Sequence, residues 1–241
     1  MNILDHGFVT LRAHTNNPGG TVVDSARCSF GSSGDDLGEK DQKLIAYLLG
    51  HGHTSPFRHA FFTFHVKAPL FVFRQWWKYQ VGSTWREYET ETGEPVRAVD
   101  IVTDSDIGCS WNELSGRYKV MEPEFYVPEH DRQQTGRQSS ERFEGDTEIE
   151  DSILRGTLME HNDSAVRSYN ALLQGGTSKE LARLVLPPSI YSEAYWTVSL
   201  QAILHFLDQR LKPEAQWEIR QYASAIMALI RPELEKMGIE S

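Results

Sequence analysis

Residues 60–77 read A-F-F-T-F-H-V-K-A-P-L-F-V-F-R-Q-W-W and contain a change of structural period. Aromatic and β-branched residues alternate with polar ones from Ala60 to Ala68, which is typical of a half-buried strand. Pro69 then fixes a backbone angle suited to the first turn of a helix, so a helix is predicted to follow as far as Trp77. A strand that leads directly into a helix is therefore the predicted centre of the fold.

Strands and helices are mixed along the rest of the chain, without a regular alternation of strand and helix. Further strands are predicted at Phe8 to Ala13 and, as an aromatic strand or extended turn, at Ile190 to Val198. A capping box at residues 177–180, T-S-K-E, predicts the start of a helix. This mixture predicts an α+β fold in which long helices flank a central, mostly antiparallel sheet. The remaining helices are predicted at Leu37–Leu49, Ile153–Leu173, Leu200–Leu211 and Pro213–Ile230, with Pro213 in the first turn of the last, and Val22–Phe30 is predicted as a short helix or turn.

The length of the chain predicts one domain. At 241 residues, with 39% hydrophobic and 11% aromatic content, the chain can fill a single core over residues 1–241. Two long polar segments interrupt this domain. Residues 84–109 predict a long loop that can hold a hairpin, and residues 129–146 contain almost no apolar side chains. We expect both segments to be inserted or mobile loops.

Charge and cysteine content bound the class of protein. The formal net charge of -10 argues against a nucleic acid polymer as partner, whereas a few arginines can still bind a single phosphate. Cys28 and Cys109 form no disulfide framework, and Cys28 is predicted to be a small core residue. The N-terminus lacks the apolar centre of a signal peptide, and no apolar run approaches the ~20 residues that span a bilayer. We therefore expect a cytoplasmic protein without a membrane partner.

Common catalytic and metal-binding motifs do not occur in the sequence. The chain has no G-x-S-x-G elbow, no Walker loop, no G-x-G-x-x-G after a strand and no H-E-x-x-H. Cys109 has no clear base nearby to activate it, and Cys28 is predicted to be a core residue, so covalent thiol catalysis is not expected. No metal site is predicted, because standard ligand spacing is not matched by His51, His53, His59 and His65.

The most specific polar motif is W-N-E-L-S-G-R-Y at Trp111 to Tyr118. Glu113 to Arg117 place an acid, a hydroxyl, a glycine and an arginine within five residues. The hydroxyl and a closely approachable backbone amide can bind phosphate oxygens, and arginine adds a planar fork of donors. Taken alone, an exposed polar turn is the simpler interpretation, and a phosphate-binding loop is the alternative.

The longer string from Ser110 to Tyr118 resembles the flavin-dependent thymidylate synthases, a family that methylates C5 of dUMP. That family's signature consists of R-H-R, a short spacer and S-x-N-E-x-S-x-R-Y. The string from Ser110 to Tyr118 matches its second half, S-x-N-E-x-S-x-R-Y. The resemblance covers most of the chain and implies that family's fold and a homotetramer whose active sites are shared between subunits. Further matching segments are residues 51–57, 62–69, 74–76, 183–187, 195–198, 205–210 and 215–223.

The chain departs from this family mainly where the family binds FAD. Lys78, Tyr79 and Gln80 replace the R-H-R triplet, and Thr84 to Cys109 separates two signature halves that are normally almost adjacent. The resemblance therefore implies a nearly intact nucleotide site beside an altered flavin site. In the family's V-N-x-R segment, the Asn and Arg are replaced by Ser199 and Gln201 in this chain. A later Asn of the family is replaced by His205, and a later His by Glu214.

By resemblance, Ser115 and Arg210 are the candidate catalytic residues. A cation at Arg210 would face the uracil ring and stabilise negative charge on its carbonyl oxygens; without the resemblance, Arg210 is a helix-end arginine paired with Asp208 or Glu214. The substrate-binding residues implied are Gln75, Glu113, Leu114, Ser115, Gly116, Arg117, Arg183 and Arg210. The cofactor-binding residues implied are His53, Ser55, Lys78, Tyr79, Gln80, Tyr118, Ser199, Gln201, His205 and Glu214.

Two classes of function remain open at this point. The first is a methylase of a uridine 5'-monophosphate, either dUMP or, as in polyoxin-type antibiotic pathways, UMP. Methylenetetrahydrofolate would supply the carbon, reduced FAD the hydride, and NADPH would reduce the FAD. The second is a uridine nucleotide-binding protein that has lost flavin catalysis. A purely structural oligomer would leave the matching Arg117, Arg183 and Arg210 unexplained.

Overall fold

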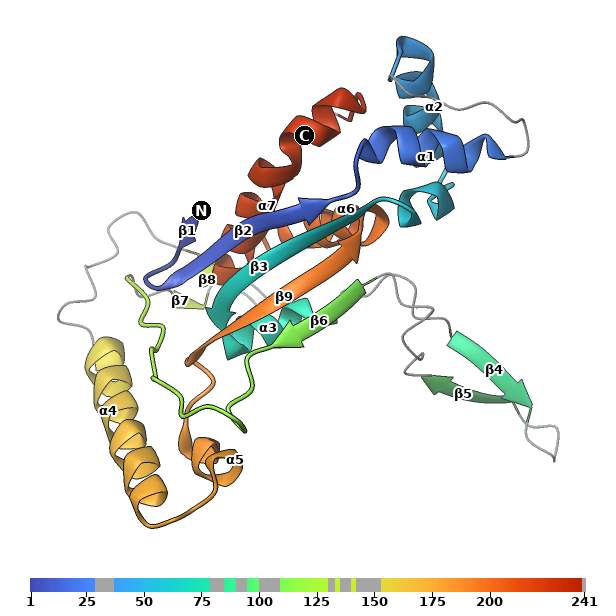
Figure 1. Cartoon of the computed structure of the whole chain (residues 1–241). Coiled ribbons are helices and arrows are strands. Elements are labelled where there is room, and N and C mark those ends of the chain that lie inside the picture. The colour runs from blue at the N-terminus through green and yellow to red at the C-terminus, as the bar shows by residue number, and fades with distance from the viewer. Residues whose placement is uncertain are drawn as a thin grey trace.

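A five-stranded antiparallel sheet forms the centre of the computed structural model, which describes residues 1–28, 37–78, 85–89, 95–99, 109–129, 133–134, 140–141 and 153–239 (Figure 1). The strand order is β1-β2-β3-β9-β6, and each neighbouring pair is antiparallel. All three strands predicted from the sequence are confirmed. The strands of this sheet are β1 (Asn2–Ile3), β2 (Gly7–His14), β3 (Phe61–Pro69), β6 (Cys109–Glu113) and β9 (Tyr191–Ser199).

Helices connect and cover these strands, so the predicted α+β class with long flanking helices is confirmed. The helix predicted after Pro69 is also confirmed, with Pro69 as its N-terminal flanking residue. The α-helices are α1 (Pro18–Ala26), α2 (Glu39–Gly50), α3 (Leu70–Trp76), α4 (Ile153–Gln174), α5 (Lys179–Ala182), α6 (Leu200–Arg210) and α7 (Trp217–Lys236). Two short 3-10 helices are η2 (Ser55–Arg58) and η4 (Arg183–Val185).

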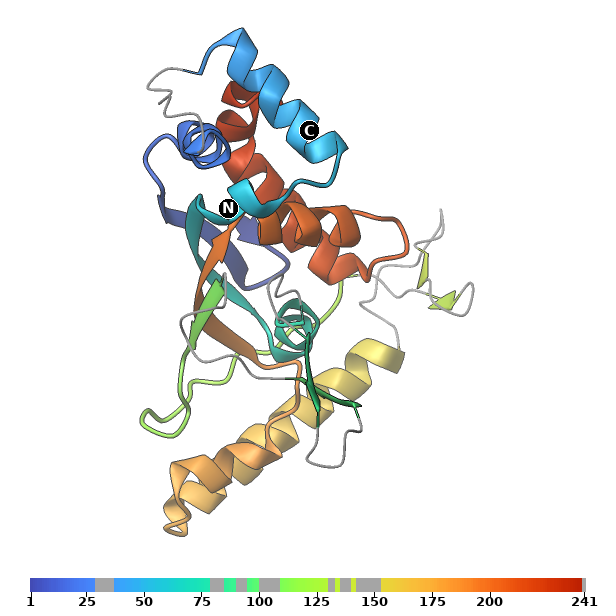
Figure 2. The ribbon, with the colours of Figure 1, turned by 90° about the vertical axis from the view of Figure 1, so that its right-hand side faces the viewer.

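One face of the sheet is packed against helices. Side chains of a strand point alternately to its two faces, and in β3 the buried set is Phe62, Phe64 and Val66. Trp76 of α3 stacks on Phe206 of α6, with ring centroids 5.1 Å apart, and also contacts Trp196 of β9. Figure 2 shows α6 and α7 together on this side of the sheet. The core therefore lies between the sheet and helices α3, α6 and α7.

The opposite face of the sheet carries polar pairs and is more accessible. Thr63 and Thr197 share a hydrogen bond of 3.0 Å between their hydroxyls. His65 lies 3.0 Å from a carboxylate oxygen of Glu193 and stacks on the ring of Tyr195, which is 43% exposed. The described helices leave this face uncovered enough for a ligand or another polypeptide to reach it.

Three local predictions are wrong. Helix α7 begins at Trp217 rather than Pro213, because a turn closed by a 3.0 Å hydrogen bond from Ala215 to Lys212 precedes it. The predicted capping box is absent, since Ser178 flanks α5 and its side chain makes no cap hydrogen bond. Cys28 is exposed rather than in the core, because α1 ends at Ala26 before Cys28 can join its buried face.

The two polar segments predicted as loops contain short strands. Strands β4 (Trp85–Glu89) and β5 (Pro95–Val99) pair as an antiparallel hairpin, as the sequence allowed, and β6 begins at Cys109. Strands β7 (Gln133–Gln134) and β8 (Ser140–Glu141) form a second pair. Helices α4 and α5 stand apart from the sheet at one end (Figure 1). Within the described residues, no helix has the length and apolar character that crossing a membrane requires.

Candidate functional site

The motif identified in the sequence forms a tight loop at the end of β6. The sheet holds its start, because the backbone N–H of Leu114 donates to the carbonyl of Glu193 at 2.8 Å. The hydroxyl of Ser192 donates to the Glu113 carboxylate at 2.7 Å. The loop then turns, and the Ser115 hydroxyl accepts a 3.3 Å hydrogen bond from the N–H of Arg117. We call Ser115, Gly116 and Arg117, together with Arg183, the nucleotide loop, because the resemblance implies that they bind the nucleotide.

Arg183 joins this loop from a segment far away in the sequence. Helix α5 leads directly into η4, which begins at Arg183. A Cβ atom added to Gly116 would lie 3.1 Å from Cδ of Arg183 and 2.8 Å from the sulfur of Met121. Glycine at 116 therefore allows the arginine stem to pass close to the backbone. The structure brings Gly116 and Arg183 together, as the resemblance implies.

Arg117 lies on the surface and has a weak acidic partner. Its Nε is 3.5 Å from the carboxylate of Glu180, and both side chains are more than half exposed. Its guanidinium also lies 5.5 Å from the ring centroid of Tyr118, whose backbone carbonyl accepts a 3.1 Å hydrogen bond from Lys179. Exposed ion pairs contribute only about 0–1 kcal/mol, so a bound phosphate can displace Glu180 from this arginine.

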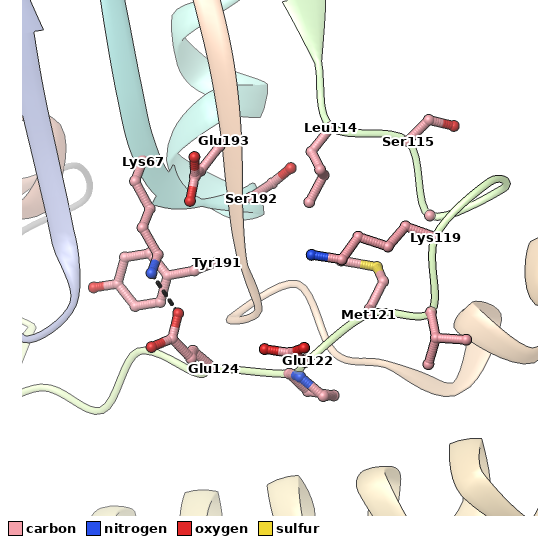
Figure 3. Close-up of a pocket in the computed structure, with 13 residues that line it drawn as sticks. Lys67, Leu114, Ser115, Lys119, Met121, Glu122, Glu124, Tyr191, Ser192 and Glu193 are labelled. Carbon is pink, nitrogen blue, oxygen red and sulfur yellow. Dashed lines mark hydrogen bonds and ion pairs between the residues drawn. The ribbon is translucent and has the colours of Figure 1, made fainter.

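A cavity of about 610 Å³ lies beside the nucleotide loop, on the polar face of the sheet (Figure 3). Lys67 and Glu124 form an ion pair at its edge, and the Lys119 amine points into it. The Ser115 hydroxyl points away from the cavity, so loop and cavity share a backbone segment but not this group. The lining residues are Lys67, Leu114, Ser115, Gly116, Lys119, Val120, Met121, Glu122, Pro123, Glu124, Tyr191, Ser192 and Glu193.

Sequence reasoning missed Lys67 and Lys119 as cavity residues. A signal for Lys67 was present, because it occupies a polar position in the alternation of β3. Tyr191 is the other notable lining residue: burial, together with its hydrogen bond to Asp5, raises its pKa above the ordinary value. Tyr191 therefore stays neutral in the folded protein and presents a hydroxyl that donates to a carboxylate.

Gln75 has partners away from the nucleotide loop. Its side-chain amide donates to the amide oxygen of Gln216, which in turn donates to the buried Glu218 carboxylate at 2.9 Å. Tyr126 donates to the same carboxylate at 3.0 Å. Arg210 is the last residue of α6 and is half-buried. Within the described residues, the hydrogen bond that Gln75 makes leads to Gln216 and not to Ser115.

Several of the predicted cofactor residues gather around η2 and the start of α6. His53 and Ser55 are exposed at η2. Gln201 donates to the Thr54 hydroxyl at 2.8 Å, and the exposed His205 follows it one turn later on the same face of α6. The ring of His53 stacks on Tyr47 of α2 at 6.3 Å between centroids. The resemblance implies cofactor binding by His53, Ser55, Gln201 and His205. We call these four residues, together with the neighbouring Arg58, the cofactor surface.

The remaining predicted cofactor residues lie elsewhere. The Ser199 side chain is buried and caps α6, accepting a 3.3 Å hydrogen bond from the N–H of Ala202. Tyr118 belongs to the nucleotide loop region and is 75% exposed. Lys78 is exposed after α3, and Glu214 is exposed in the turn before α7. Tyr79 and Gln80 lie outside the described residues.

The nucleotide loop and the cofactor surface lie beyond opposite ends of strand β9. Glu113 pairs with Ala194 near the start of β9, whereas α6 follows its other end at Ser199. Five steps of extended strand between Ala194 and Ser199 correspond to about 17 Å. Within one chain, the two surfaces are therefore separated by several residues of extended strand.

Comparison with known proteins identifies the family of this chain. The family described as thymidylate synthase complementing protein matches residues 10–234. A flavin-dependent thymidylate synthase from Thermus thermophilus is 39% identical over 229 residues, which are 95% of this chain and 73% of the relative. Another from Thermotoga neapolitana is 37% identical, over 95% of this chain and 88% of the relative.

A solved structure supports the same assignment. The UMP/dUMP methylase PolB from Streptomyces cacaoi, bound with 5-Br dUMP, has a TM-score of 0.73 at 27% identity. The match covers 98% of this chain and 96% of that chain. Family, fold and motif thus agree along nearly the whole length of the chain. The chain belongs to the flavin-dependent thymidylate synthase family.

Proposed function

We propose that this protein methylates C5 of the uracil of a uridine 5'-monophosphate. The observation that supports this best is the nucleotide loop, in which Ser115, Gly116 and Arg117 turn against Arg183. Two guanidinium groups, a hydroxyl and a close backbone approach suit a phosphate monoester. Hydrogen bonds to a charged group contribute about 1.5–3 kcal/mol each, so two arginines suffice for a small nucleotide.

The proposed roles of the other substrate residues follow the family resemblance. Glu113 and Leu114 would border the nucleotide, and Gln75 would contact it with its amide. Arg210 would stabilise negative charge on the uracil carbonyl oxygens when C5 becomes nucleophilic. No cysteine is needed as a nucleophile in this scheme.

The cofactor surface suits an FAD cofactor. Exposed imidazoles at His53 and His205 offer ring faces and donors, and the stacked Tyr47 adds an aromatic platform. When bound, reduced FAD would supply the hydride, after reduction by NADPH, and methylenetetrahydrofolate would supply the carbon. Lys78 would retain a positive charge where the family has arginine, although an ammonium lacks arginine's planar fork.

We also propose that the enzyme acts as a homotetramer. The family resemblance implies active sites shared between subunits, and the separation of the nucleotide loop and the cofactor surface along β9, about 17 Å, is compatible with a neighbouring copy contributing to each site. The polar face of the sheet, with the exposed Tyr195, would meet that copy. Its partners would be small molecules in the cytoplasm, with no nucleic acid polymer and no membrane.

The choice between UMP and dUMP is the central test of this proposal. The hairpin β4–β5 separates the two halves of the family signature, which favours a specialised enzyme that accepts the ribonucleotide. The test measures turnover of UMP and dUMP with methylenetetrahydrofolate, NADPH and FAD, and identifies the 5-methyl product. Turnover of UMP at a rate comparable to dUMP is expected. A strict preference for dUMP would leave ordinary thymidylate synthesis and reject the specialised version.

A second candidate is a uridine nucleotide-binding protein that has lost flavin catalysis. Lys78, Tyr79 and Gln80, in place of an R-H-R triplet, are the observation that favours it. Purified protein that stays colourless and takes up no added FAD, yet binds UMP or dUMP, would establish this alternative. Flavin uptake with product formation would reject it.

A further inference from the structure

Arg58 is the one member of the cofactor surface that the sequence did not single out. Its Nε donates to the side-chain oxygen of Gln201 at 2.6 Å, and Gln201 donates to the hydroxyl of Thr54 at 2.8 Å. The arginine is thereby held from both η2 and α6. Because only Nε is used in this contact, the two terminal nitrogens of the guanidinium remain as donors.

The charge of this guanidinium has no acidic partner in the described part of the chain. Arg27 lies 2.7 Å from Asp41 and Arg117 lies 3.5 Å from Glu180, whereas no ion pair involves Arg58. An exposed arginine that is fixed by neutral hydrogen bonds, with its fork of donors still available, is preorganised for an anion.

The position of Arg58 matches a change in the sequence. The resemblance leads us to expect an arginine at position 201, and the chain has glutamine there. Arg58 brings a guanidinium to that same glutamine side chain from the neighbouring η2. The cation missing from α6 is therefore present at the same surface, on another element.

We propose that Arg58 binds a phosphate of a dinucleotide cofactor, and that Gln201 and Thr54 position its guanidinium. The assignment rests on the proposed function, in which the cofactor is FAD. Arg58, in η2, would supply a planar fork of N–H donors. The ammonium of Lys78, which follows α3, has no such fork. The altered flavin motif is then a redistribution of cations rather than a loss of the cofactor site.

The test measures binding of FAD and of riboflavin, which has no phosphate, by flavin fluorescence in the wild-type protein and in R58Q. We expect R58Q to weaken FAD binding about tenfold or more, the loss of one charge-assisted hydrogen bond, and to leave riboflavin binding unchanged. Added salt should reduce FAD affinity less in R58Q than in the wild type. The matched control is R167Q, because Arg167 is an exposed arginine of α4 and should not affect either ligand.

A charge-relocation variant tests the position as well as the charge. R58Q/Q201R returns the arginine to α6, and we expect it to recover most of the FAD affinity that R58Q loses. Equal FAD affinity in R58Q and wild type would overturn the assignment, and so would an equal loss of FAD and riboflavin. If wild-type protein binds no FAD at all, the proposed function fails as well. Thermal melting and gel filtration of R58Q check that fold and assembly are unchanged.

Discussion

The nucleotide loop and the cofactor surface are built in different ways. Three of the four residues of the nucleotide loop are consecutive in the sequence, and one strand, β6, holds them in place. The cofactor surface combines η2 with the start of α6, which lie more than 140 residues apart and meet through the Arg58–Gln201 hydrogen bond. A continuous loop changes as one unit, whereas a surface from two elements can exchange the positions of its charged groups.

This difference predicts which substitutions each region tolerates. In the nucleotide loop, a Cβ atom at position 116 would press on the side chains of Met121 and Arg183, so a larger residue there must displace them. On the cofactor surface, Arg58 and Gln201 come from η2 and α6 and share one hydrogen bond, so under our proposal a cation on either element would reach the same space. We therefore expect sharp effects from the nucleotide loop and compensable effects from the cofactor surface.

The largest effect is expected from Arg183→Ala. Loss of one or two charge-assisted hydrogen bonds to phosphate should weaken UMP and dUMP binding about 10- to 150-fold, while FAD affinity stays within about twofold of wild type. Isothermal titration with each nucleotide, and flavin fluorescence with FAD, measure the two affinities separately. Arg167→Ala on α4 is the control and should change neither. Wild-type nucleotide affinity in Arg183→Ala would show that the nucleotide binds elsewhere.

A smaller effect is expected from Gly116→Ala. The added Cβ would lie 2.8 Å from the sulfur of Met121 and 3.1 Å from Cδ of Arg183, so both flexible side chains must move. We expect nucleotide affinity to fall about 3- to 10-fold, because overpacking of this size costs about 1 kcal/mol and displaces Arg183. Gly156→Ala, a helical glycine of α4 with open space around it, is the matched control. An unchanged affinity would mean that Arg183 does not contact the ligand.

The same difference explains how much the sequence could predict. The alternation of β3 is a local pattern, and the predicted strand is confirmed. The motif that overlaps the end of β6 is also a local pattern, and its role in binding a phosphate stays a prediction. The start of α7 was misplaced because the turn at Lys212 to Ala215 competes with the helix signal of Pro213. Arg58 could not be predicted, since its meaning depends on Gln201, a residue that only tertiary packing brings near it. For Lys67 the sequence shows only a polar position in the alternation of β3, and the cavity that it lines is completed by residues 114–124.

The smallest effects concern stability against pH, and the two ends of the molecule should respond in opposite directions. Burial and the hydrogen bond to Asp5 raise the pKa of Tyr191, beside the cavity, above that of an unfolded tyrosine. Folded protein thus retains a proton that the unfolded chain releases near pH 10, so the free energy of unfolding falls as pH rises above about 10. The backbone N–H of Gly38 and the nearby Arg27 lower the pKa of Asp41 on α2, which leads to His53. That contribution is lost as pH falls below the ordinary value of 3.8.

Thermal melting of Tyr191→Phe and Asp41→Asn at several pH values separates the two contributions. Tyr191→Phe removes one donor to Asp5, and about 1 kcal/mol of lost stability near neutral pH corresponds to a Tm about 2–4 °C lower. Above about pH 10 the melting temperature of Tyr191→Phe should fall less steeply than that of the wild type. Some decline should remain, because the pKa of Tyr222 is raised as well. Asp41→Asn should instead flatten the decline below pH 4 and leave the alkaline limb unchanged. If either variant changed the melting temperature equally in the acid and the alkaline range, Tyr191 and Asp41 would not contribute to stability independently. The difference between the two regions would then not extend to stability.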